Sequence, residues 1–167
     1  VLVLAAGYPL GGALGDYLFK RNPRGRLVVA TTGVILGAIL MVITLSIPHE
    51  QVGLFLVSLS LTALCVPLAS ANVAATLYDI TLPEVRSTAM AVQSFIESIG
   101  SAVAPLMVGL IAYAFSLQAA FLLICTITWG LCALFFVFTA RRIEADIHTM
   151  HQELHRRSQQ QPLVAES

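Results

Sequence analysis

The stretch GYPLGGALGDYLFKRNPRGR, residues 7–26, joins two hydrophobic runs of the chain. Its glycines Gly7, Gly11 and Gly15 recur every four residues and are followed by Asp16 and then by a cluster of cations. In a helix this spacing aligns the glycines on one face, where a neighbouring backbone approaches closely. The stretch therefore predicts a helix end packed tightly on another helix, followed by a charged turn.

The composition is that of a membrane protein. Of the 167 residues 57% are hydrophobic and 11% are charged, whereas a soluble domain has about 25% charged residues. Crossing a bilayer takes about 20 apolar residues, and the runs of that length are residues 27–47, 52–77, 88–113 and 117–140. The run at residues 1–14 is too short to span, and because no Met or basic segment precedes it, a truncated helix is favoured over a signal peptide.

The basic residues are distributed unevenly, although the net charge is zero. If each long run crosses once, the first loop, the third loop and the tail lie on one side, and the other two connections have no Lys or Arg. By the positive-inside rule we expect the basic side and the C-terminus to be cytoplasmic, in a plasma membrane or bacterial inner membrane. These three places hold all nine basic residues, Lys20, Arg21, Arg24, Arg26, Arg86, Arg141, Arg142, Arg156 and Arg157.

Two motifs resemble the major facilitator superfamily. The sequence GALGD from Gly12 to Asp16, followed by Lys20 and Arg21, is similar to the signature loop between the second and third helices of each six-helix half. The sequence PEVRSTA at residues 83–89 is similar to the fourth loop of a half. The fifth helix of a half is matched by Gly100, Ala104, Pro105 and Gly109.

The resemblance implies an all-α membrane protein, a partial six-helix half of a twelve-helix fold. Residues 1–140 would be helices 8 to 12, the first of them truncated, and residues 141–167 a cytoplasmic tail, so the chain would be a C-terminal fragment whose partner is the N-terminal half of the same protein. The implied function is secondary transport of a small solute by alternating access, as a proton-coupled symporter or an exchanger.

The signature loop predicts a gate on the cytoplasmic side. Asp16 is placed to accept hydrogen bonds from the N-terminal N–H groups of a helix in the other half, because the positive end of a helix dipole favours a carboxylate. Lys20 is placed to reach Asp79, and we expect this pair to hold while that side is closed. Alternatively, the loop cations only determine topology. The expected gating residues are Gly12, Asp16, Lys20, Arg21, Asp79 and Arg86.

Glu97 is the only charged side chain within any of the long runs. It lies about nine residues, or roughly 13 Å, from Thr88, well inside a hydrocarbon core of about 30 Å. A carboxylate at that depth costs about 2.5 kcal/mol or more, so we expect Glu97 to face the bundle interior with a partner or a proton. Gln93 and Ser101 share its helical face.

The candidate solute-binding or proton-coupling residues are Glu97, Gln93, Ser101 and, on the run at residues 52–77, Asn72. Glu97 serves as a proton-coupling site, as a binding site for a cationic or polar part of the solute, or as a structural hydrogen-bond partner of the other half. Asn72 either faces a water-filled cavity or bonds to a neighbouring helix. Close packing or bending is expected at Gly33, Gly37, Pro67, Gly100, Pro105 and Gly109.

The tail has apolar residues at helical spacing, including Ile143 and Ile147. This pattern predicts an amphipathic helix over residues 142–157, lying on the membrane surface or against the loops, and disorder from Ser158 onward. The histidines of this segment have no acid or Cys at a spacing that completes a metal site.

No cofactor, metal or nucleic acid is expected as a ligand, because the cations lie at membrane edges and the cysteines within apolar runs. Enzyme activity is not expected either, since the sequence has no Walker loop and no nucleophile elbow. Two other functions remain open. The protein is a membrane scaffold or sensor that transports nothing, or it is the membrane subunit of an ATP-driven importer.

Overall fold

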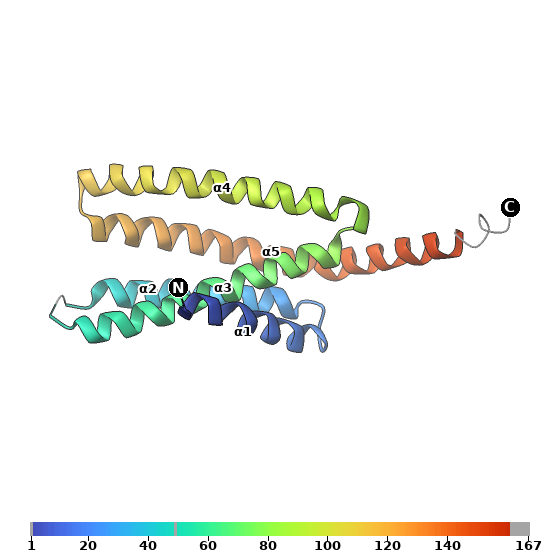
Figure 1. Ribbon diagram of the computed structural model, residues 1–167, viewed down its shortest axis with the longest axis horizontal. Helices are drawn as coiled ribbons and strands as arrows, with labels where there is room; N and C mark the ends of the chain where they lie inside the picture. Colours follow the sequence, from blue (N-terminus) through green and yellow to red (C-terminus); the bar gives the residue numbers. More distant parts are fainter. Residues whose placement is uncertain (1, 49, 161–167) are drawn as a thin grey trace.

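The computed structural model describes residues 2–48 and 50–160, and these residues form five α-helices and no strand. Consecutive helices run in opposite directions and are joined by short loops (Figure 1). The expected all-α fold with five helices is therefore confirmed. The helices are α1 (Leu2–Phe19), α2 (Gly25–Ser46), α3 (Val52–Ile80), α4 (Pro83–Ala114) and α5 (Leu117–Gln160).

Four helices of the described residues are long and apolar enough to cross a membrane, namely α2, α3, α4 and most of α5. The 18-residue α1 is not among them, in line with its short apolar run. α4 begins five residues before the run predicted at residues 88–113, because Pro83 opens it after an extended Leu82. Proline suits the first turn of a helix, where its missing N–H would have no partner within the helix.

The helices form two groups. α2 packs against α1, α3 and α5, whereas α4 packs mainly against α5. Figure 1 shows α4 and α5 as an antiparallel pair beside the group of α1, α2 and α3. No residue of α4 is buried.

The glycine face of α1 lies against α3, as the four-residue spacing predicted. A Cβ at Gly7 would lie 2.9 Å from the side chain of Pro67, and a Cβ at Gly11 would lie 2.8 Å from the Cα of Leu68. Pro67 is fully buried in this contact, and α3 continues through it. The small residues therefore set the distance between the two backbones.

The glycines of α2 and α4 differ in their surroundings. A Cβ at Gly33 would lie 3.1 Å from the Leu68 side chain, and one at Gly37 would lie 2.8 Å from the Trp129 ring. α2 therefore packs closely on α3 and α5. In contrast, a Cβ at Gly100 or Gly109 would meet no described atom within 4 Å, so close packing at these two positions of α4 stays a prediction, as does bending at Pro105.

The helix expected over residues 142–157 is a direct continuation of α5, which runs to Gln160. Ile143 and Ile147 are buried on it and pack with Leu27 at the start of α2, and Phe19 lies against the same cluster. This segment therefore packs against the helix ends that flank the α1–α2 loop. Of the two expected arrangements, on the membrane surface or against the loops, the structure shows the second. The predicted disorder begins at Ser158, but residues 158–160 are helical, and residues 161–167 lie outside the described residues.

Candidate functional site

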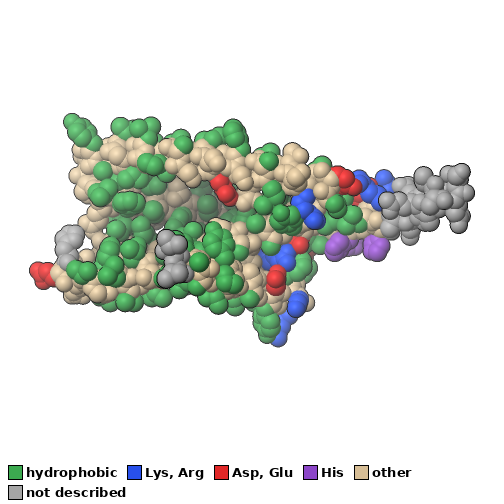
Figure 2. All heavy atoms as spheres, viewed as in Figure 1, with side chains coloured by type: hydrophobic (Ala, Val, Ile, Leu, Met, Phe, Trp, Pro, Cys, Tyr) green, Lys and Arg blue, Asp and Glu red, His purple; other side chains and the backbone are tan. Residues whose placement is uncertain are grey.

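Charged side chains gather at one end of the bundle, which we call the basic end. It comprises the α1–α2 loop, the α3–α4 loop and the part of α5 beyond Ala140. Figure 2 shows Lys and Arg side chains at this end and hydrophobic side chains over the helices. Two candidate sites follow, a charge cluster at the basic end and an acid in the middle of α4.

The charge cluster is centred on Arg26, in the first turn of α2. Its Nη2 donates to Oδ1 of Asp16 at the end of α1, at 2.7 Å. Its Nη1 donates to the carboxylate of Asp79 near the end of α3, and to the carbonyl oxygen of Ala75 at 3.4 Å. One guanidinium, with 16% of its side chain exposed, thus joins the ends of three helices.

The expected pairing of Lys20 with Asp79 is not observed. Asp79 pairs with Arg26, and the exposed Lys20 side chain makes no ion pair within the described part of the chain. Lys20 belongs to the loop that follows α1, whereas Arg26 lies on α2, which packs against α3. The fork of a guanidinium also bonds two carboxylates at once more readily than an ammonium does.

Two further expected gating residues contact only nearby atoms. Arg86 donates to the carbonyl oxygen of Tyr78 at 3.0 Å and lies over its ring, so it bonds a carbonyl that the end of α3 leaves unpaired. The guanidinium of Arg21 lies 4.7 Å from the centre of the Tyr17 ring. A Cβ at Gly12 would meet nothing within 4 Å in the described residues.

A second set of ion pairs ties the extension of α5 to the other helices. Glu144 accepts from Nη2 of Arg24 at 2.8 Å, at the start of α2. Arg157 bonds Glu84 in the first turn of α4 at 3.1 Å and Glu153 on its own helix at 3.0 Å. The side chains of these pairs are 31–64% exposed, and ion pairs at this exposure contribute little to stability.

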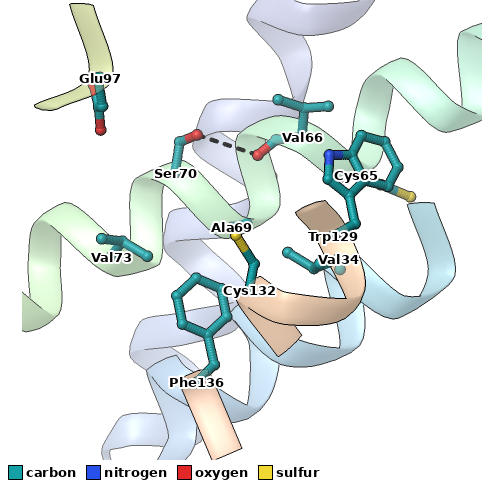
Figure 3. Close-up of a pocket in the computed structure, with 11 residues that line it drawn as sticks. Val34, Cys65, Val66, Ala69, Ser70, Val73, Glu97, Trp129, Cys132 and Phe136 are labelled. Atoms are coloured by element: carbon teal, nitrogen blue, oxygen red, sulfur yellow. Dashed lines mark hydrogen bonds between the residues drawn. The ribbon is translucent and has the colours of Figure 1, made fainter. Parts of the chain in front are cut away.

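Glu97 lies near the middle of α4, beside a cavity of about 280 Å³. Figure 3 shows its carboxylate pointing toward the side of α3 that carries Ser70, with Trp129 and Phe136 of α5 on the opposite wall. A second cavity of about 520 Å³ on the basic side is lined by both Glu97 and Gln93. Glu97 therefore stands where two cavities meet.

Most side chains that line these cavities are apolar, and the hydroxyls of Thr76 and Thr139 donate to carbonyl oxygens of their own helices. Gln93 donates from Nε2 to Oε1 of Glu97 at 2.8 Å, while its own Oε1 is buried with no partner in the described residues. The Ser70 hydroxyl donates to the carbonyl oxygen of Val66 at 3.4 Å. The acceptor oxygens of Gln93 and Glu97 are thus available to a ligand that carries a positive charge or N–H groups.

Two of the four candidate residues lie elsewhere. Asn72 is 1% exposed and donates to the carbonyl oxygens of Gly11 and Leu68 at 2.9 and 2.7 Å. The sequence allowed Asn72 either to face a water-filled cavity or to bond to a neighbouring helix, and the structure shows the bond to α1. Ser101 is exposed and lines neither cavity beside Glu97, so the described site consists of Gln93 and Glu97.

The spanning helices and the charges gathered at their ends define a multi-pass integral membrane protein. A sequence model described as Major Facilitator Superfamily matches residues 1–164. The chain therefore belongs to the Major Facilitator Superfamily and is of the membrane transporter class. No curated protein matches the chain.

Proposed function

We propose that the protein is a secondary transporter that moves a small solute by alternating access, with Glu97 as the group that binds a proton or a cationic part of the solute. The observation that supports this most is the carboxylate of Glu97, near the middle of a spanning helix and beside two cavities. Transporter sites of this kind lie near the bilayer midplane. In this proposal the five helices are helices 8 to 12 of twelve.

The surroundings of Glu97 suit a transient ligand. Within the described residues Glu97 accepts a hydrogen bond from Gln93, whose amide carries no charge that could neutralise the carboxylate. An ionised carboxylate in the apolar part of a bilayer costs about 2.5 kcal/mol or more, so a proton or a cation that neutralises it is favoured. Release of that ligand to water restores the charge, and this cycle couples binding to access.

The cluster around Arg26 supplies a gate in this proposal. One cation satisfies both Asp16 and Asp79, so α1 and α3 are held together at the basic end through α2. Separation of these helix ends leaves at least one carboxylate without its cation. We propose that the basic end faces the cytoplasm and that the cluster is intact while that side is closed.

The test is reconstitution of the full-length protein in liposomes that contain a fluorescent pH indicator. Under an imposed pH gradient, panels of sugars, amino acids, organic acids and organic cations are added outside, with protein-free liposomes as the control. We expect one class of solute to collapse the gradient. A folded protein that gives no solute-dependent flux with any class would contradict the proposal and support a scaffold or sensor.

A further inference from the structure

A groove of about 280 Å³ lies between α2 and α5 at the basic end. Arg24 and Arg141 line its charged part, and Val28, Thr32 and Val137 line its apolar part. This groove is separate from the cluster of Arg26 and from the cavities beside Glu97, none of whose lining residues it shares. It therefore needs its own explanation.

The two arginines stand where the apolar parts of both helices begin. Arg24 directly precedes Gly25, the first residue of a spanning helix, and Arg141 directly follows the apolar run that ends at Ala140. Cations at this level lie beside the lipid headgroups, where basic pockets between spanning helices bind anionic lipids. The position of the groove thus fits a lipid headgroup.

The arginines have donors to spare. Arg24 uses Nη2 for Glu144, and its Nε has no partner within the described residues. Arg141 makes no ion pair in that part of the chain, and its guanidinium lies 5.7 Å from the centre of the Phe138 ring. Each guanidinium has five N–H donors, and two arginines against one glutamate leave the groove with a net positive charge.

The rest of the groove is suited to a hydrocarbon chain. Val28 is 45% exposed and Val137 is 42% exposed, and both lie on spanning helices. The hydroxyl of Thr32 donates to the carbonyl oxygen of Val28 at 2.8 Å, so its polar group is occupied. The groove therefore combines a cationic end with an apolar end, as the headgroup and acyl chain of a phospholipid require.

We propose that this groove binds an anionic phospholipid, with the phosphate on Arg24 and Arg141 and an acyl chain along Val28 and Val137. A free phosphate ion would use only the cationic end, and the exposed valines favour the lipid as the source of the phosphate. The bound lipid joins α2 to α5 beside the ion pair of Arg24 and Glu144. This proposal does not depend on the identity of the transported solute.

The test is lipid binding to the purified full-length protein, titrated by native mass spectrometry with phosphatidylglycerol or with phosphatidylcholine. One basic residue contributes about 1 kcal/mol to attraction of anionic lipid, so Arg141→Gln should weaken phosphatidylglycerol binding about fivefold. Arg142→Gln is the matched control, because its exposed side chain is outside the groove. Arg142→Gln should weaken phosphatidylglycerol binding less than Arg141→Gln does, because it leaves both arginines of the groove in place.

A second variant tests the apolar end. Val28→Trp fills the groove and leaves its charge unchanged, so phosphatidylglycerol binding should fall by a similar factor while the circular dichroism spectrum stays that of the wild type. Glycerol phosphate, which has the headgroup and no acyl chain, should not displace the lipid. Equal loss in Arg141→Gln and Arg142→Gln, equal binding of the two lipids, or displacement by glycerol phosphate would each overturn the proposal.

Discussion

The side-chain amide of Asn72 on α3 donates to the carbonyl oxygen of Gly11 on α1, at 2.9 Å. The oxygen of the same amide lies 1.7 Å from the point where a Cβ of Gly15 would stand. A buried amide on α3 therefore fits against a glycine on α1, and both residues are needed for the close approach of the two helices.

Gly15→Ala should destabilise the protein. The new Cβ requires Asn72 to move, and Asn72 is held by its bonds to Gly11 and Leu68. Overpacking of this kind costs about 1–3 kcal/mol. The midpoint of thermal unfolding in detergent measures the effect.

Gly12→Ala is the matched control, because its Cβ would meet nothing within 4 Å in the described residues. Alanine in a helix is favoured over glycine by about 0.5–1 kcal/mol, so this variant should be as stable as the wild type or more so. Adding Asn72→Ala to Gly15→Ala should recover part of the loss from overpacking. Equal unfolding midpoints for Gly15→Ala and Gly12→Ala would show that the contact is not tight.

Arg26→Gln should destabilise the basic end, because it leaves Asp16 and Asp79 without their shared cation. A hydrogen bond to a charged group contributes about 1.5–3 kcal/mol, and most of the effect should come from Asp79, since Asp16 is 59% exposed. Lys20→Gln removes one charge from the same region and should leave the unfolding midpoint unchanged. A larger drop of the unfolding midpoint in Lys20→Gln than in Arg26→Gln would contradict this and would support the pairing of Lys20 with Asp79.

Ile143→Ala should loosen the extension of α5. The Ile143 side chain is 1% exposed, and truncation of a buried isoleucine costs about 2–5 kcal/mol. Amide hydrogen exchange over residues 141–157, measured by mass spectrometry, should accelerate. Ile127→Ala on the same helix is the control, because Ile127 is 59% exposed, and it should leave the exchange of this segment unchanged.

Most of the fold was predictable from the sequence, because it follows from the lengths of the apolar runs and from the positions of the charged residues. The long apolar runs fix the number of spanning helices, and the glycines of α1 fix its contact face. The continuity of α5 was not predicted, because Arg141 and Arg142 end the apolar run. The sequence signal for it was that no Gly or Pro follows them up to Gln160. Burial of Ile143 under the loop ends then continues the helix beyond the run.

The sequence predicted that Asp79 pairs with a cation at the basic end, but it assigned Lys20 to that pair and assigned Asp16 to a helix N-terminus of the other half. In the structure Arg26 bonds both carboxylates. The choice of Arg26 over Lys20 depends on the packing of α2 against α3, which sequence spacing does not specify. One available signal was that Arg26 directly precedes an apolar run, which places it nearer the core than Lys20, Arg21 or Arg24.

The sidedness of the basic end is tested by cysteine labelling in intact cells. Asn22→Cys and Asp146→Cys are placed at the basic end, and Gln51→Cys in the loop between α2 and α3, each in a protein whose native cysteines are replaced by serine. The positive-inside rule predicts that a membrane-impermeant maleimide labels only the variant at residue 51 before the cells are opened. Labelling of residues 22 and 146 on opposite sides would contradict the topology.

The most direct test of the central claim compares two kinds of flux in liposomes with Glu97→Gln, using the solute class that the wild type transports. Glutamine keeps the shape and the hydrogen bond to Gln93 but holds no titratable proton, and Glu50→Gln in the loop between α2 and α3 is the control. The account predicts that Glu97→Gln loses uptake driven by a pH gradient. Solute exchange at equal pH persists if Glu97 carries the coupling proton and is lost as well if Glu97 binds the solute. Uptake with the pH dependence of the wild type would contradict the account.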